Sequence, residues 1–176
     1  MISSKYFLIP RASGQDAAML NQLITQMEFV RNKHLNYISR FSTAVLDVRL
    51  GEGGNSIGTL LKHLAAMEYK CQLATFEGRG LNESEQERWR GALNGELILN
   101  LIKGHDIDYY IQLLTEVRKE TLQQMMQKND EWLLGSTAYH YDTPTNNYFC
   151  WFHIMEDEIG HIGQIKMLMS LFKNKV

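Results

Sequence analysis

Three imidazole and carboxylate side chains near the C-terminus have a spacing suited to metal binding. His153, Asp157 and His161 follow one another at intervals of four residues. In an α-helix such residues lie one turn apart along a single stripe, close enough for two of them to bind the same ion. Imidazole nitrogens and carboxylate oxygens together suit zinc and related divalent metals. The spacing therefore predicts two ligands from one helix, with a third supplied by another helix.

His63 is the candidate for that third ligand. It shares a helical face with Leu60, Met67 and Cys71, which predicts that its side chain points inward. A buried histidine needs partners for its ring nitrogens, and a metal ion is one such partner. The alternative is a core histidine that bonds only to protein atoms, which is the commoner arrangement.

The stripe of the C-terminal segment also has a simpler interpretation as the solvated face of its helix. Apolar residues cover the opposite side. They are Trp151, Ile154, Met155, Ile162, Ile165 and Met169. Against that interpretation, the stripe has no lysine or arginine, and Glu158 and Lys166 interrupt the side that would be buried. Periodicity alone leaves both interpretations open.

Four long stretches with helical periodicity would position these residues. They cover about 16–39, 56–76, 106–128 and 144–172. The glycine-rich turn 51–54 separates the first two, and Asn55 or Ser56 can cap the second. Thr143 followed by Pro144 makes a good cap and first turn for the fourth. Four helices with one long connection predict an all-α four-helix bundle with a long loop crossover.

The connections carry little regular structure. Residues 82–90 form a charged loop, in which a short helical turn is expected near Trp89. Residues 137–141 are the best candidate for a strand, and this segment is short. We expect one domain over residues 1–176, long enough to bury a sizeable core without a disulfide or a structural metal.

Composition argues against several classes of protein. The chain has 18 Lys and Arg against 20 Asp and Glu, so no strongly basic face for nucleic acid is expected. Two cysteines, Cys71 and Cys150, are fewer than a disulfide scaffold needs. We expect them to be buried free thiols in a reducing compartment. The N-terminal apolar run is too short for a signal peptide, and no stretch is long enough to cross a membrane. We therefore expect a cytoplasmic protein without nucleic-acid or membrane partners.

The C-terminal segment resembles the last-helix motif of the DinB/YfiT-like family, the DinB superfamily, which reads roughly F-H-x-x-E-H-E-x-x-H-x-G-Q-I. Here the motif stands as Phe-His-Ile-Met-Glu-Asp-Glu-Ile-Gly-His-Ile-Gly-Gln-Ile over residues 152–165. Residues 56–68 are similar to the family's other signature, on its second helix. Residues 76–81, followed by Trp89, resemble the loop after that helix. The order and spacing of these motifs are specific together, and the four-helix layout covers nearly the whole chain.

The resemblance implies a metal triad of His63, Asp157 and His161. His153 would be an added ligand or a partner behind the ligands. Asp157 stands where the family most often has histidine, and Ile162 stands where arginine is frequent. A set of two histidines and one aspartate suits zinc, nickel, manganese or iron and leaves coordination positions open.

The resemblance also implies metal-assisted chemistry on a small molecule. Members with known activity use a low-molecular-weight thiol as the nucleophile, and others are described only as metal-dependent hydrolases. We therefore expect a thiol S-transferase or a hydrolase. Glu156 or Glu158 could assist as a base, although solvated surface carboxylates are the favoured interpretation of both. The alternative is a non-catalytic stress-related or interaction protein with a degenerate site, which Asp157 and the missing arginine favour.

Dimers are common in the family. The abundant apolar residues of the first and third helices, together with nine methionines in the chain, are compatible with a homodimer. They are equally compatible with one well-filled core, so both arrangements stay open.

Overall fold

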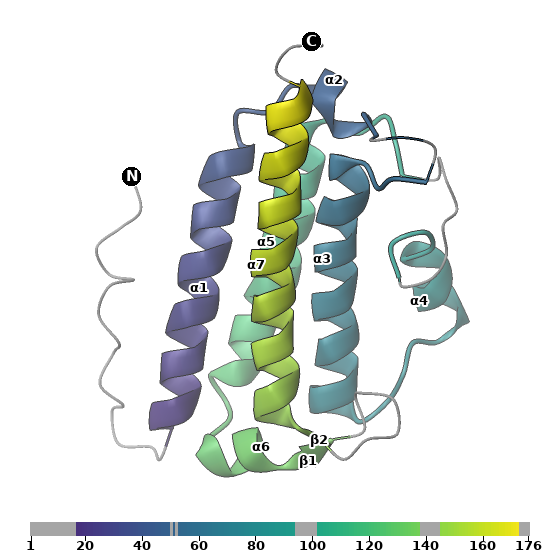
Figure 1. The fold of residues 1–176 in the computed structure, drawn as a ribbon. Helices are drawn as coiled ribbons and strands as arrows, with labels where there is room; N and C mark the ends of the chain where they lie inside the picture. Colours follow the sequence, from purple (N-terminus) through teal and green to yellow (C-terminus); the bar gives the residue numbers. More distant parts are fainter. Residues whose placement is uncertain (1–16, 50, 52, 94–101, 138–144, 173–176) are drawn as a thin grey trace.

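Four long helices lie side by side and form a bundle, with the short elements at its ends and along one flank (Figure 1). The computed structural model describes residues 17–49, 51, 53–93, 102–137 and 145–172. The long helices are α1 (Ala18–Ile38), α3 (Ile57–Gln72), α5 (Ile107–Met125) and α7 (Asn147–Phe172). This arrangement confirms the all-α four-helix bundle expected from the sequence.

The helix starts follow the local chemistry of the sequence. Ser56 caps α3 by accepting a hydrogen bond from the Thr59 amide, and Asp106 caps α5 in the same way. α7 begins at Asn147, so the expected cap at residues 143–144 lies outside the described residues. The predicted bounds of α1, α3 and α5 agree with the structure to within a few residues at each end.

Short elements occupy the connections, and most of them are additions to the prediction. They are α2 (Thr43–Leu46), the π-helical turn η2 (Leu73–Glu77), α4 (Glu83–Arg88), α6 (Asp130–Leu134), β1 (Ser136–Thr137) and β2 (Thr145–Asn146). β1 and β2 pair antiparallel, which places a strand near the expected position; residues 138–141 of that candidate lie outside the described part. η2 continues α3 by one wider turn and ends at Gly78, whose φ of 66° is left-handed.

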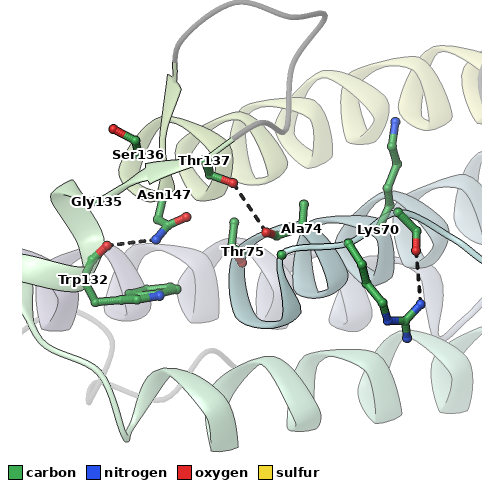
Figure 2. A pocket seen from close by; sticks show the side chains of 11 residues that line it. Lys70, Ala74, Thr75, Trp132, Gly135, Ser136, Thr137 and Asn147 are labelled. Carbon is green, nitrogen blue, oxygen red and sulfur yellow. Dashed lines mark hydrogen bonds between the residues drawn. The ribbon is translucent and has the colours of Figure 1, made fainter.

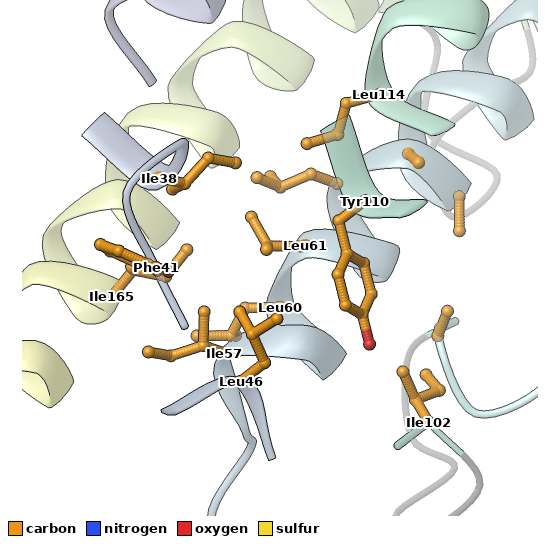
Figure 3. Packing of buried hydrophobic residues seen from close by; sticks show 14 of the residues in the cluster. Ile38, Phe41, Leu46, Ile57, Leu60, Leu61, Ile102, Tyr110, Leu114 and Ile165 are labelled. Atoms are coloured by element: carbon orange, nitrogen blue, oxygen red, sulfur yellow. The ribbon is translucent and has the colours of Figure 1, made fainter. Parts of the chain in front are cut away.

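Side chains from all four long helices meet in the core. Figure 3 shows Ile38 of α1, Leu61 of α3, Leu114 of α5 and Ile165 of α7 pointing toward one another, and all four are buried. A second buried cluster, which includes Trp151 of α7, lies outside this group. No helix among the described residues is long and apolar enough to cross a membrane.

The loop between α3 and α5 folds back onto the bundle through α4. Asn82 and Glu85 form a reciprocal capping box that starts this short helix. Trp89, at its C-terminal end, is fully buried within the main core cluster. The charged segment therefore contains a short helix next to Trp89, in agreement with the helical turn expected there, and its one large apolar residue docks it on the bundle.

Candidate metal centre

The structure brings the three ligands predicted from the sequence into one cluster. His63 lies on α3, whereas Asp157 and His161 lie one turn apart on α7. The two helices lie side by side and run in opposite directions (Figure 1). One ligand atom from each residue can be chosen so that all three lie within 4.8 Å of one another.

Asp157 lies between the two imidazoles. Its Oδ1 is 3.3 Å from His161 Nε2, and its Oδ2 is 3.5 Å from His63 Nε2. The two rings stand edge to face with their centroids 4.9 Å apart. The three side chains are 15–23% exposed, so the cluster is half-buried and open to solvent on one side.

Hydrogen bonds behind the two histidines fix which ring nitrogen faces Asp157. His63 Nδ1 donates to the Ala92 carbonyl oxygen at 2.7 Å, and His161 Nδ1 donates to Gln164 Oε1 at 3.1 Å. A carbonyl oxygen can only accept, so both Nδ1 atoms carry protons. Each Nε2 is thereby turned toward Asp157, an orientation suited to metal binding through Nε2.

The charges within the cluster favour an ionised carboxylate. Burial alone would raise the pKa of Asp157, but the adjacent imidazoles of His161 and His63 outweigh it and lower that pKa well below its ordinary value. Burial opposes the charged form of His161, but the hydrogen bond and charge of Asp157 raise the pKa of this histidine. An anion therefore lies between two imidazole nitrogens, which is the charge arrangement that a cation needs.

The donor atoms fit a divalent metal. Asp157 Oδ2 is buried and has no hydrogen-bond partner among the described residues, since its contact with His63 lacks hydrogen-bond geometry. An unpartnered buried carboxylate oxygen is costly, and a cation would remove that cost. Two imidazole nitrogens and one carboxylate oxygen suit zinc, nickel, manganese or iron.

A family model covers most of the chain. A model of the DinB superfamily matches residues 26–165, which contain all three residues of the cluster. The chain belongs to the DinB superfamily. A search of the curated proteins found no match.

Two polar residues next to the cluster lie outside it in this DinB-superfamily protein. His153 Nδ1 is 3.2 Å from Glu156 Oε2, one turn along the same helix face. The Glu156 side chain is 60% exposed, as expected for a solvated surface carboxylate. His153 is absent from the group of described residues that could share an ion, so its role as a further ligand stays a prediction.

Glu158 differs from the sequence-based expectation. It was expected to be a solvated carboxylate or an assisting base, but it is 1% exposed. Arg31 donates to it from Nε at 2.7 Å, and Arg118 from Nη2 at 3.3 Å. His34 Nδ1 also lies 3.4 Å from it. The expectation was wrong because Arg31, 127 residues away in the sequence, packs against this position on α7.

Each long helix of the bundle contributes one member to this buried network of charges. Glu68 of α3 pairs with Arg31 of α1 at 2.8 Å and with Arg118 of α5 at 2.6 Å, and Glu158 of α7 pairs with both arginines. Two positive and two negative groups balance, and the Leu114 and Met27 carbonyls accept further hydrogen bonds from the arginines. The network was missed from the sequence, where the only signal was a charged residue on the apolar face of each helix.

Two cavities lie away from the cluster in the described part of this DinB-superfamily protein. One, of about 570 Å³, lies at the C-terminal end of α3, and Figure 2 shows Thr75, Trp132, Thr137 and Asn147 around it. The other, of about 410 Å³, lies between α1 and α5. Neither lining includes His63, Asp157 or His161.

Proposed function

We propose that this protein is a divalent-metal-dependent enzyme that acts on a small molecule. His63, Asp157 and His161 would hold the metal. The convergence of these three side chains from two helices, with both histidines oriented by their Nδ1 hydrogen bonds, is the observation that carries the proposal. Family membership supports it.

A divalent ion held by three protein ligands keeps a coordination position open and, when bound, lowers the pKa of water or a thiol or polarises a carbonyl. The protein ligands would set the net charge of the metal centre. Asp157 supplies one negative charge in place of the neutral imidazole that is commonest in the family. Two imidazoles and one carboxylate leave a divalent centre with one net positive charge, instead of two for three imidazoles.

The nucleophile would come from solution. Both cysteines are free and buried, and burial raises the pKa of Cys71 and raises that of Cys150 to about 11. Neither thiol is therefore available as a thiolate near neutral pH. Water or a low-molecular-weight thiol remains, which corresponds to a hydrolase or a thiol S-transferase.

The alternative proposal is a non-catalytic stress-related or interaction protein with a degenerate metal site. Two observations favour it. Asp157 replaces the commonest family ligand, and the two cavities described above lie away from the cluster. The two proposals differ in whether a stoichiometric metal is bound.

Metal content tests the proposal directly. We expect about one equivalent of zinc, nickel, manganese or iron in tag-free protein, measured by inductively coupled plasma mass spectrometry. His63→Ala and His161→Ala should both lose it, whereas Glu156→Gln should keep it as the matched control. A metal-free parent protein that also takes up no added ion would refute the enzyme and leave the non-catalytic alternative.

A positive result would justify a screen of small thiols and electrophiles with the metal-loaded protein. Turnover that requires an added thiol would identify an S-transferase, and turnover in water alone would identify a hydrolase. A homodimer is also proposed, and light scattering on the same preparation would test it.

A further inference from the structure

We propose that the segment from Arg79 to Ala92, here called the α4 segment, is a positioning element of the metal centre. It orients the His63 ring through the Ala92 carbonyl. This inference rests on the proposed metal site. It adds that a segment outside α3 and α7 orients one of the proposed ligands.

The contact between the α4 segment and His63 is short and partly buried. The Ala92 carbonyl oxygen lies 2.7 Å from His63 Nδ1, and Ala92 is 2% exposed. The bond fixes both the tautomer and the rotation of the ring. Without this acceptor, His63 could place its proton on Nε2, which is the nitrogen that faces Asp157.

Backbone geometry and a buried indole hold the Ala92 carbonyl in place. The Ala92 amide donates to the Trp89 carbonyl at 2.9 Å, and Gly91 between them has a left-handed φ of 75°. Trp89 is fully buried, with its ring 5.4 Å from that of Tyr69 on α3. The docked indole therefore sets where the following turn, and its carbonyl, lies relative to α3.

Polar contacts tie the start of the segment to the same helix. The Tyr69 hydroxyl donates to Glu85 at 2.8 Å, and Arg79 donates to both oxygens of that carboxylate at 2.7 and 2.9 Å. Glu85 also closes the capping box with Asn82. Glu85 thus connects the α4 segment to Tyr69 of α3, six residues after His63.

The three proposed ligands differ in what orients them. His161 is held by Gln164 on its own helix, and Asp157 lies between the two imidazoles. Only His63, among these three described residues, depends on an acceptor from another segment. By linkage, a metal that needs the oriented His63 binds more tightly when the α4 segment is docked, and bound metal in turn stabilises docking.

Substitution of Trp89 tests the inference. Trp89→Ala removes the anchor, and we expect zinc affinity to fall about 10- to 100-fold, the range seen when a partner behind a metal ligand is lost. Trp89→Phe is the matched control. It keeps an aromatic ring and removes an indole N–H that has no partner among the described residues, so near-parental affinity is expected. Competition with a chromophoric chelator would measure zinc binding, and circular dichroism would verify the helices.

The tautomer of His63 gives a second measurement that needs no metal. Long-range ¹H–¹⁵N NMR at about pH 8 should show a proton on Nδ1 in parent and Trp89→Phe, and a mixture of tautomers in Trp89→Ala. Gly91→Ala, which strains the left-handed turn without touching the buried indole, should shift affinity and tautomer in the same direction if Trp89→Ala fails to fold.

Two results would overturn the inference while leaving the metal site intact. One is parental zinc affinity in a folded Trp89→Ala or Gly91→Ala protein. The other is a parental His63 with its proton on Nε2. A parent that binds no zinc would instead refute the proposed metal site, and the tautomer measurement would then decide the positioning role by itself.

Discussion

At the scale of single residues, the hydrogen bonds behind the two histidines shape the cluster as much as the three proposed ligands themselves. Two Nδ1 hydrogen bonds turn the His63 and His161 rings, and Asp157 lies between their Nε2 atoms. Asp157 is the departure from the commonest family pattern, and its Oδ2 has no hydrogen-bond partner among the described residues. Substitutions at this position are therefore the most informative.

Asp157→Asn should abolish tight metal binding while preserving the size and shape of the side chain. Loss of the anionic ligand is expected to weaken zinc binding by more than about 100-fold, because loss of a mere supporting partner costs 10- to 100-fold. In the metal-free protein the pKa of His161 should also fall, since Asp157 raises it. Zinc titration and an NMR pH titration would measure these effects. Glu156→Gln, an exposed change one residue away, should leave zinc affinity near the parental value; equal loss in both variants would contradict the assignment.

Gly58 is required by a close contact in the core. A Cβ at this position would collide with the Tyr110 hydroxyl and lie 3.3 Å from the Leu46 carbonyl oxygen. Overpacking of this kind costs about 1–3 kcal/mol, so Gly58→Ala should lower the free energy of unfolding by that amount. Urea denaturation would measure it. Tyr110→Phe removes the colliding oxygen, which has no partner among the described residues, and should recover part of the loss in the double variant. Strict additivity of the two changes would show that the contact is not responsible.

At the scale of secondary-structure elements, each long helix carries one charged residue into the middle of the bundle. Arg31, Glu68, Arg118 and Glu158 come from α1, α3, α5 and α7 in that order and are all 3% exposed or less. A sliding or rotated helix would leave a charge buried without its partners. The network therefore disfavours alternative registers, which an apolar core of similar volume would tolerate more easily.

Removing one charge from this network should be strongly destabilising. Glu68→Gln keeps the size of the side chain but leaves two buried arginines with one carboxylate, and breaking a buried pair costs about 3–5 kcal/mol. We expect the free energy of unfolding to fall by this amount in guanidinium denaturation. Glu120→Gln on the exposed side of α5 is the control and should change stability by less than about 0.5 kcal/mol. A Glu68→Gln protein as stable as the control would mean that the pairs contribute nothing to folding.

At the scale of the whole molecule, the buried ionisable groups predict how stability depends on pH. Burial opposes ionisation of Glu68, but Arg118 and Arg31 outweigh it and lower its pKa below the ordinary 4.5. Burial lowers the pKa of His34 below 6.5, against the opposing effect of Glu158. In both cases the unfolded chain binds more protons than the folded chain at acidic pH, so stability rises with pH.

The contributions of His34 and Glu68 to stability should therefore be lost in two stages on acidification. Below about pH 6.5 the unfolded chain protonates His34 while the folded chain resists, and below about 4.5 the same holds for Glu68. Above pH 7 both contributions are complete and stability should be flat with respect to these groups. Denaturant midpoints between pH 4 and 8 would measure the profile in metal-free protein. His34→Gln should flatten the first stage only; an unchanged first stage would assign it to other groups.

The sequence by itself determined the helices and the ligand spacing. Apolar periodicity and caps such as Ser56 act within a few residues, so they are readable without the fold. Asp157 and His161 share a helix face for the same local reason, because i and i+4 positions are neighbours on any α-helix. The pairing of this helix with His63 on α3 followed from the family resemblance, and the structure agrees with it.

Tertiary structure alone decided what surrounds those ligands. Glu158 is next to Asp157 in the sequence, yet one is buried between Arg31 and Arg118 and the other lies at the half-buried cluster, because these arginines, 127 and 40 residues away, pack on one side only. The acceptor for His63 is a backbone carbonyl at Ala92, and a carbonyl has no sequence signature since every residue carries one. Burial and backbone contacts depend on how distant segments pack, which local patterns do not encode.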